Sequence, residues 1–180
     1  FQHVDSENIN YRGIHQFNPE SMEFAAGAKL HEIGQCNSCH FYGEEFPTGD
    51  APTWAPNLAL TKERLNPGWV TEWLKNPGAI MPGTKMPAPY VPDSEILSME
   101  GAENDWGKAL VAINGDTTTM LDGLRDYLWD IKGPTNIDAL IKAYFDENGY
   151  DFDSESGDEY EDEDDDWDDD DDWGDDDEED

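Results

Sequence analysis

Hydrophobic side chains recur every three to four residues in several segments of the chain, a spacing typical of amphipathic helices. The first such segment begins at Asn18, which can cap a helix, and Pro19 suits its first turn. Gly34 predicts that the helix ends near Ile33. Three side chains of this segment share its expected packing face: Phe24, Ala25 and Ala28.

Four more segments follow the same helical spacing. One begins at Asn66-Pro67 and closes at Asn76-Pro77, and weaker patterns cover residues 105–113 and 136–147. The strongest pattern runs from Thr117 to Lys132 and ends before Gly133-Pro134. The expected apolar faces contain Trp69, Val70, Trp73 and Leu74, then Leu121, Leu124, Leu128 and Ile131, then Ile137, Leu140, Ile141, Tyr144 and Phe145.

Two intervening stretches lack any helical or strand period. Residues 41–61 are rich in Gly, Pro, Asp and Thr, and residues 80–92 are interrupted repeatedly by proline, so both are expected to be irregular. No useful alternation of apolar and polar residues appears in the chain. The pattern therefore predicts an all-α protein with long loops.

The distribution of charged residues divides the chain into parts more clearly than the pattern of hydrophobic residues does. Residues 151–180 contain 22 of the 44 Asp and Glu and no Lys or Arg, within a chain of net charge −34. Such a segment cannot bury enough apolar surface to offset the entropy of ordering it. We therefore expect an N-terminal arm over residues 1–17, a domain over 18–133, an additional amphipathic helix over 134–149, and a disordered acidic tail over 150–180.

The acidic charge also limits the partners. Nucleic acid and anionic membranes repel such a chain, whereas basic surfaces of partner proteins attract it. The tail, with Tyr160, Trp167 and Trp173, is expected to serve solubility, docking to a basic partner, adaptation to high salt, or weak Ca²⁺ binding. No apolar run is long enough to span a membrane. The first residue, Phe1, suggests that an upstream signal, anchor or larger portion has been removed.

The only two cysteines form the sequence Cys36-Asn37-Ser38-Cys39-His40, the Cys-x-x-Cys-His pattern of covalent haem attachment. Two thiols at this spacing can reach the two vinyl groups of one porphyrin, and the adjacent histidine then meets the iron. A haem would also organise a domain with such long loops. Candidate pocket-wall residues are Trp54, Leu58, Trp69, Trp73, Leu124 and Leu128.

Three other interpretations of this motif are open. A two-cysteine redox site normally follows a strand, and none is predicted before Cys36. A structural zinc site needs four ligands, but the chain has no second cysteine pair. A disulfide closing so short a loop would stabilise little.

Beyond this motif, the order of segments resembles class I cytochromes c. A helix enters Cys36–His40, followed by Ala55-Pro56-Asn57-Leu58, then Pro82-Gly83-Thr84-Lys85-Met86-Pro87, then a closing helix. The resemblance covers roughly residues 20–132. It implies one haem c, with His40 and Met86 as axial ligands and the Pro56 carbonyl orienting His40. Gly27 and Leu30 match loosely the glycine and aromatic of the family's first helix.

Other side chains that can bind iron are assigned differently. Met81 lies in the same proline-rich segment as Met86, but only Met86 occupies the motif position. Met99 and Met120 fall at helix positions, so we expect them in the core. His31 is expected to face solvent, and His3 and His15 lie in the arm.

This resemblance implies a one-electron carrier between a respiratory donor complex or dehydrogenase and a terminal oxidase or reductase, not an enzyme by itself. A fixed monohaem subunit of a membrane respiratory complex is the alternative, and a haem-based gas or redox sensor is a third. Haem attachment to such motifs implies a periplasmic or otherwise extracytoplasmic location. The additional helix is expected to pack on the cytochrome surface or on another subunit.

Overall fold

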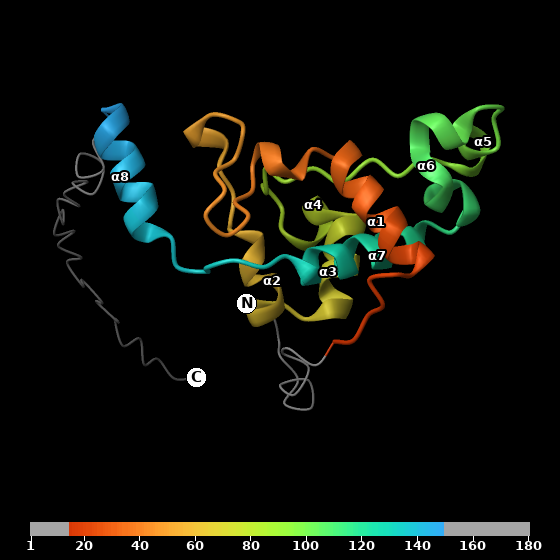
Figure 1. The fold of residues 1–180 in the computed structure, drawn as a ribbon, viewed down its shortest axis with the longest axis horizontal. Helices are drawn as coiled ribbons and strands as arrows, with labels where there is room; N and C mark the ends of the chain where they lie inside the picture. Colours follow the sequence, from red (N-terminus) through yellow and green to blue (C-terminus); the bar gives the residue numbers. More distant parts are fainter. Residues whose placement is uncertain (1–14, 150–180) are drawn as a thin grey trace, which may run out of the picture. The chain divides into compact units, whose positions relative to one another are not determined.

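A computed structural model describes residues 15–149 of the 180-residue chain. No strand occurs within this range, where isolated bridges join only His40 to Ala55 and Tyr42 to Glu45. The helical prediction is thus confirmed for the described residues, while the first fourteen residues of the arm and the acidic tail lie outside them. The helices in chain order are α1 (Met22–Ile33), α2 (Thr61–Arg64), α3 (Pro67–Lys75), α4 (Pro77–Ile80), α5 (Ser94–Leu97), α6 (Ala102–Ala112), α7 (Thr117–Asp130) and α8 (Asp138–Asn148) (Figure 1).

The centre of the fold is the crossing of α1 and α7 (Figure 1). The backbones approach so closely that a Cβ on Gly27 would lie 2.0 Å from the carbonyl oxygen of Gly123. A Cβ on Gly123 would lie 1.9 Å from the carbonyl oxygen of Glu23. Only glycine fits at both positions, because a methyl group would occupy the space of the facing backbone.

The start and the packing face of α1 differ from the sequence prediction. Ser21, not Asn18, caps the helix, since its hydroxyl accepts the Phe24 N–H at 3.1 Å. Asn18 instead accepts the Glu20 N–H in the preceding turn. The expected face was also wrong in part: Ala25 is exposed, and the buried residues of α1 are Ala26, Gly27 and Leu30. The backbones of α1 and α7 can approach closely only where Gly27 faces α7. This requirement buries the face that contains Gly27 rather than the predicted face with the larger Phe24 side chain.

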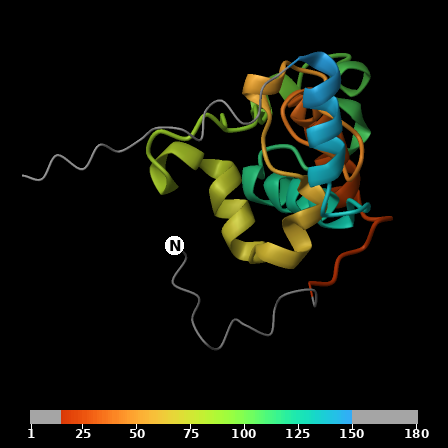
Figure 2. The same ribbon diagram turned by 90° about the vertical axis from the view of Figure 1, so that its left-hand side faces the viewer.

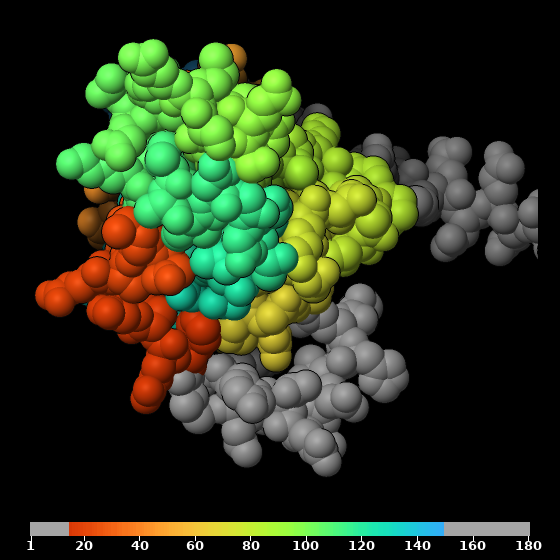
Figure 3. All heavy atoms as spheres, turned by 90° about the vertical axis from the view of Figure 1, so that its right-hand side faces the viewer, coloured from red at the N-terminus to blue at the C-terminus, as the bar shows by residue number. Residues whose placement is uncertain are grey.

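The later helices follow the predicted apolar faces more closely. Val70 and Leu74 of α3 are buried, as are Leu121, Leu124 and Leu128 of α7. Figure 3 shows α7 (teal) flanked by α1 (red), α3 (yellow) and the α5–α6 region (green). The expectation that Met120 lies in the core is also confirmed, since only 1% of it is exposed.

Between the proline-rich segment and α7, the structure differs from the predicted helices and from the predicted burial. The short α5 was missed, because a four-residue helix has too few positions to show a period. Met99 follows it and is 64% exposed, so the expectation of a core methionine was wrong. Residues 102–112 form α6, in which Gly107 has a positive φ of 81° and breaks the regular helix.

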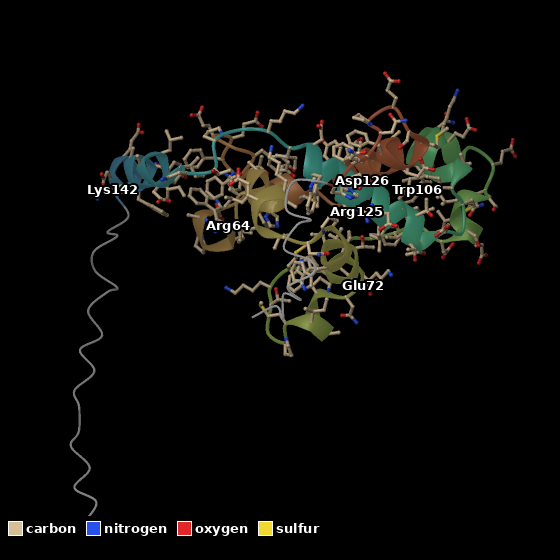
Figure 4. The ribbon with its side chains drawn as sticks, turned by 90° about the horizontal axis from the view of Figure 1, so that it is seen from below. Arg64, Glu72, Trp106, Arg125, Asp126 and Lys142 are labelled. Carbon is tan, nitrogen blue, oxygen red and sulfur yellow. The ribbon has the colours of Figure 1, made fainter. Side chains whose placement is uncertain are left out.

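Polar side chains fix the segment before α1 to α7. The His15 Nε2 lies 2.7 Å from Asp126 Oδ1, and Arg125 bridges to the same oxygen at 2.8 Å. Figure 4 shows Arg125 and Asp126 next to one another on α7. Residues at the end of the predicted arm are therefore held on the helical domain.

The chain divides into one unit through Leu140 and a second from Ile141 onwards. The predicted helix after Gly133-Pro134 is present as α8, beginning at Asp138. Within residues 15–149, no helix has the length and apolar character needed to cross a bilayer.

Candidate haem site

The cysteine motif forms a tight helical turn directly after α1. Gly34 ends the helix, and Gln35 adopts a left-handed conformation with φ 48° that turns the chain into a 3-10 turn over Cys36–Ser38. The His40 N–H donates to the Cys36 carbonyl at 3.0 Å, which closes the turn. Both thiols are free and partly buried. Cys36, Cys39 and His40 therefore project from one compact turn, as the spacing predicts.

An extended segment, residues 55–58, pairs with residues 39–41 and orients His40. The Ala55 N–H donates to the Cys39 carbonyl at 2.7 Å, and the Leu58 N–H donates to the Phe41 carbonyl at 2.9 Å. This pairing places the Pro56 carbonyl oxygen 2.7 Å from His40 Nδ1. The structure thus brings together the two residues that the resemblance assigned to the ligand and its orienting carbonyl.

The hydrogen bond to Pro56 determines which nitrogen of His40 can bind a metal. A carbonyl only accepts, so Nδ1 carries the proton and Nε2 keeps its lone pair. Burial lowers the pKa of His40, although the Pro56 carbonyl opposes this shift. The imidazole is consequently neutral near pH 7, and its Nε2 lone pair is available to a metal ion.

Cys36 lacks the lowered thiol pKa that is typical of a reactive redox cysteine. Burial raises the pKa of the Cys36 thiol. A hydrogen bond from the Cys36 backbone opposes this shift, and the nearby Cys39 adds to it. A catalytic cysteine needs a lowered pKa, because the thiolate is the nucleophile. Among residues 15–149, no three His, Cys, Asp or Glu side chains gather as a metal-binding group, which leaves no ligand set for zinc there.

Asn57 is a structural residue of the site that the sequence did not single out. Its buried side chain accepts the N–H groups of Gly43 and Ala59 and donates to the carbonyls of Gly43 and Pro134. These contacts hold the loop after His40 against the segment that carries Pro56. Nothing in the local sequence signals them, because Pro134 is 77 residues away.

An aromatic cluster supports the long loop that follows the motif. Phe41, Phe46 and Trp54 meet edge to face with centroid distances of 5.0 to 5.4 Å. The Trp54 indole donates to the Gly49 carbonyl at 2.9 Å, and the Gly49 N–H donates to the Ser38 carbonyl at 2.9 Å. The loop therefore has a core of its own and returns to the cysteine turn.

Met86 lies in the irregular segment between α4 and α5, which we call the strap (residues 81–93). It is half-buried and packs against the main core, whereas Met81 is 57% exposed. Its Sδ atom accepts a hydrogen bond from Trp73 Nε1 of α3 at 2.8 Å. Of the two methionines in the segment, Met86 is thus the one that packs against the core.

The remaining pocket-wall candidates divide into two groups. Leu58 and Trp69 join Met86 among the partly buried side chains that pack against the core, while Leu124 and Leu128 belong to the buried core itself.

His31 does not face solvent, so that expectation was wrong. It is half-buried, hydrogen-bonded to the Tyr42 hydroxyl, and packed on the Tyr127 ring at a centroid distance of 4.7 Å. Burial lowers the pKa of His31, and the nearby His40 lowers it further. The Tyr42 side chain shields this histidine, and the sequence offered no sign that the loop would return to α1.

Comparison with known proteins gives one similarity to an oxidase subunit. In an alignment 109 positions long, which covers 55% of this chain, the sequence is 34% identical to cytochrome c oxidase subunit 2 of Bacillus subtilis (strain 168). The chain matches 30% of that protein's length, less than a third of the curated relative. No family model matches the chain, and no solved structure matches it.

Proposed function

We propose that this chain holds one haem c, attached through Cys36 and Cys39, and passes single electrons in a respiratory chain. The observation that carries the proposal is the pairing of His40 Nδ1 with the Pro56 carbonyl at 2.7 Å. It leaves Nε2 of a neutral imidazole as a metal ligand, directly after Cys39 and in the same turn as the free thiols of Cys36 and Cys39. This donor set fits a covalently attached haem better than zinc or a disulfide.

Each side chain has a separate role in the proposed site. Cys36 and Cys39 fix the porphyrin by thioether bonds, His40 binds one axial position, and Met86 binds the other. A bound haem supplies the reversible one-electron couple. Because His40 and Met86 close both axial positions, oxygen chemistry is disfavoured and electron transfer is favoured. None of the four residues needs to act as a catalytic acid, base or nucleophile.

The similarity to an oxidase subunit favours one of the two respiratory roles. A protein related to subunit 2 of an oxidase acts within an oxidoreductase complex more naturally than as a freely diffusing carrier. We therefore propose that the haem domain is a fixed electron-transfer unit of a membrane-bound terminal oxidase, on the extracytoplasmic side. It then takes part in an enzyme complex without carrying out the oxygen chemistry.

The proposed route for electrons passes the surface beside Met86. Ile80 and Met81, shortly before Met86 in the chain, are 42% and 57% exposed, and Lys85 is also exposed. Residues 51–92 contain four Lys and Arg against two Glu, in a chain of net charge −34. This segment is less acidic than the rest of the chain, so we propose that a redox partner docks near its exposed side chains Ile80, Met81 and Lys85.

The mass and the visible spectrum of the protein, produced in a host that attaches haem c, test the proposal. We expect a mass greater than that of the polypeptide by one haem and a six-coordinate low-spin spectrum. Met86→Leu should abolish the methionine-to-iron absorption band, and Met81→Leu should leave it intact. A mass equal to the bare polypeptide would falsify haem attachment, and loss of the band only in Met81→Leu would assign the ligand to Met81.

A separate measurement distinguishes the fixed subunit from the free carrier. When the native source is solubilised in mild detergent, we expect the haem domain to co-purify with a copper- and haem-containing oxidase. Recovery of the whole population as a water-soluble monomer with a reversible redox spectrum would support the free carrier instead. Carbon monoxide binding by the reduced protein at neutral pH would favour a sensor.

A further inference from the structure

Helices α5 and α6 border an open groove that the proposed haem site does not use. In Figure 1 these helices (green) lie to the right of α1 and α7, whereas the loop after the cysteine turn (orange) lies to their left. The groove is therefore on the opposite side of the α1–α7 crossing from that loop. Its lining includes the apolar side chains of Leu97, Met99, Ala102 and Val111 and the polar side chains of Glu103 and Asn114.

Met99 provides the groove with an exposed apolar side chain. It is 64% exposed, the highest value among the large apolar side chains of residues 15–149. The lining residues Leu97 and Ala102 are buried, so the groove joins buried apolar side chains to an exposed one. An exposed apolar centre bordered by polar residues is characteristic of protein interaction sites. The unbranched thioether side chain of methionine can also adapt its shape to a partner.

Hydrogen bonds hold the groove in one shape. The Asp93 carboxylate accepts the Ile96 N–H at 2.9 Å and begins α5. The Ser98 hydroxyl donates to the Ser94 carbonyl at 2.6 Å, and the same hydroxyl accepts the Asn114 side-chain N–H at 2.8 Å. The second of these contacts joins the end of α5 to the turn after α6. A partner can thus bind a preformed surface with little rearrangement.

The segment that forms the groove is strongly acidic. Residues 93–116 contain six Asp and Glu against a single lysine, Lys108. Asp93 and Asp116 cap α5 and α7, and the other four carboxylates are exposed: Glu95, Glu100, Glu103 and Asp105. No ion pair within residues 15–149 includes any of these four. Their negative charge is therefore available to a cationic partner.

We propose that the α5–α6 groove binds a basic segment of a neighbouring protein. Lys and Arg side chains of that segment pair with Glu100 and Glu103, and an apolar side chain of the segment contacts Met99. The charge selects this occupant. A second copy of this chain has a net charge of −34 and is repelled, as are nucleic acid and anionic lipid surfaces.

The position of the groove favours anchoring over electron transfer. The proposed haem is attached on the other side of the α1–α7 crossing, and the groove uses neither Ile80 nor Met81. A partner bound in the groove therefore leaves the exposed side chains of Ile80 and Met81 accessible to a redox partner. The place of this contact within an oxidase complex rests on the proposed function, whereas the chemistry of the groove does not.

A photo-cross-linking amino acid in the groove tests the proposal in the full chain. p-Benzoylphenylalanine replaces Met99 or, as a second position in the groove, Asn104, and membranes of the native source that contain the variant are irradiated. Mass spectrometry of the cross-linked peptides identifies the partner. We expect both positions to join one polypeptide at a segment rich in Lys and Arg. The same amino acid in place of Met22, which is 49% exposed on α1, should not join that segment.

Charge reversal tests the role of the carboxylates. Glu100→Lys combined with Glu103→Lys should lower the cross-linking yield at position 99 about tenfold, because two attractive contacts become repulsive. Glu20→Lys combined with Glu63→Lys is the matched control, since it changes the net charge equally at two exposed carboxylates outside the groove. Its yield should stay within about twofold of the wild type. Raising the salt from about 50 to 500 mM should also lower the wild-type yield.

Several outcomes would overturn the proposal: a cross-link to a second copy of the chain, to lipid or to an acidic segment, or no cross-link at either groove position. Equal yields in the two double variants would overturn it too, because the carboxylates of the groove would then have no specific part. The mass of the same chain shows separately whether haem is attached. A bare polypeptide that still joins a basic segment would refute the proposed function and leave the groove proposal standing. Attached haem without a cross-link would refute the groove proposal alone.

Discussion

The crossing of α1 and α7 provides the most direct test of the fold. In Gly27→Ala the new methyl carbon would lie 2.0 Å from the Gly123 carbonyl oxygen and 2.1 Å from its carbonyl carbon. Ordinary contacts between such atoms are about 3.5 Å, so the two helices must separate by more than 1 Å, roughly. Neither obstacle is the end of a flexible side chain. The strain cannot relax without moving a helix that packs on most of the core.

We expect Gly27→Ala to lower the free energy of unfolding by about 3 kcal/mol, the upper part of the range for overpacked cores. For a domain of this size the thermal midpoint should fall by roughly 10 °C. Gly78→Ala is the control, because its Cβ would meet only the Asn76 side chain at 3.9 Å. It should change stability by less than about 1 kcal/mol. Circular dichroism during thermal and denaturant unfolding measures both variants, and a Gly27→Ala midpoint equal to the wild type would refute the crossing geometry.

Three further predictions concern the loop, a buried histidine and the strap. Asn57→Ala removes the hydrogen-bonding partner of buried groups such as the Gly43 amide. Denaturant unfolding should therefore show a free energy of unfolding lower by about 2–4 kcal/mol. Because burial holds the folded pKa of His31 low, the free energy of unfolding should decline as the pH drops below about 6.5. His31→Gln should reduce this decline, and a variant that kept the full dependence on pH would contradict the prediction. Oxidation by an anionic reagent such as hexacyanoferrate should slow as salt rises from about 10 to 150 mM, because the surface around Lys85 attracts it. Lys85→Glu should reverse this trend, and a wild-type rate that rises with salt would mean that the whole-chain charge dominates.

The parts of the structure that the sequence predicts are those governed by local physics. The boundaries of α3 follow from Asn66, whose side chain accepts two N–H groups of the first turn, and from the Asn76-Pro77 break. The faces of α3 and α7 follow from the spacing of large apolar residues. The start of α1 failed because two capping residues, Asn18 and Ser21, compete within one turn and both use their side chains.

The cysteine turn was predictable for a chemical reason. Covalent attachment to one porphyrin, as we propose it, would restrict the separation of the thiols and require the histidine beside them, so the spacing of the motif itself predicts a tight turn. The partner of that histidine required the resemblance as well, since Pro56 reaches His40 only through the pairing of residues 39–41 with 55–58. His31 failed for the opposite reason: its burial depends on Tyr42 and Tyr127, which come from a loop and a distant helix.

Trp73 shows where prediction from the pattern ends. Its spacing assigned it to the apolar face of α3, and its partial burial agrees with that assignment. The atom that it contacts depends on the rotation of α3, which is fixed by a hydrogen bond from Thr71 to Asp122, 51 residues further along the chain. It depends equally on the strap, where Thr84 holds the Met86 backbone. A helical period can therefore place a tryptophan near Met86, but only tertiary contacts set the direction of its N–H.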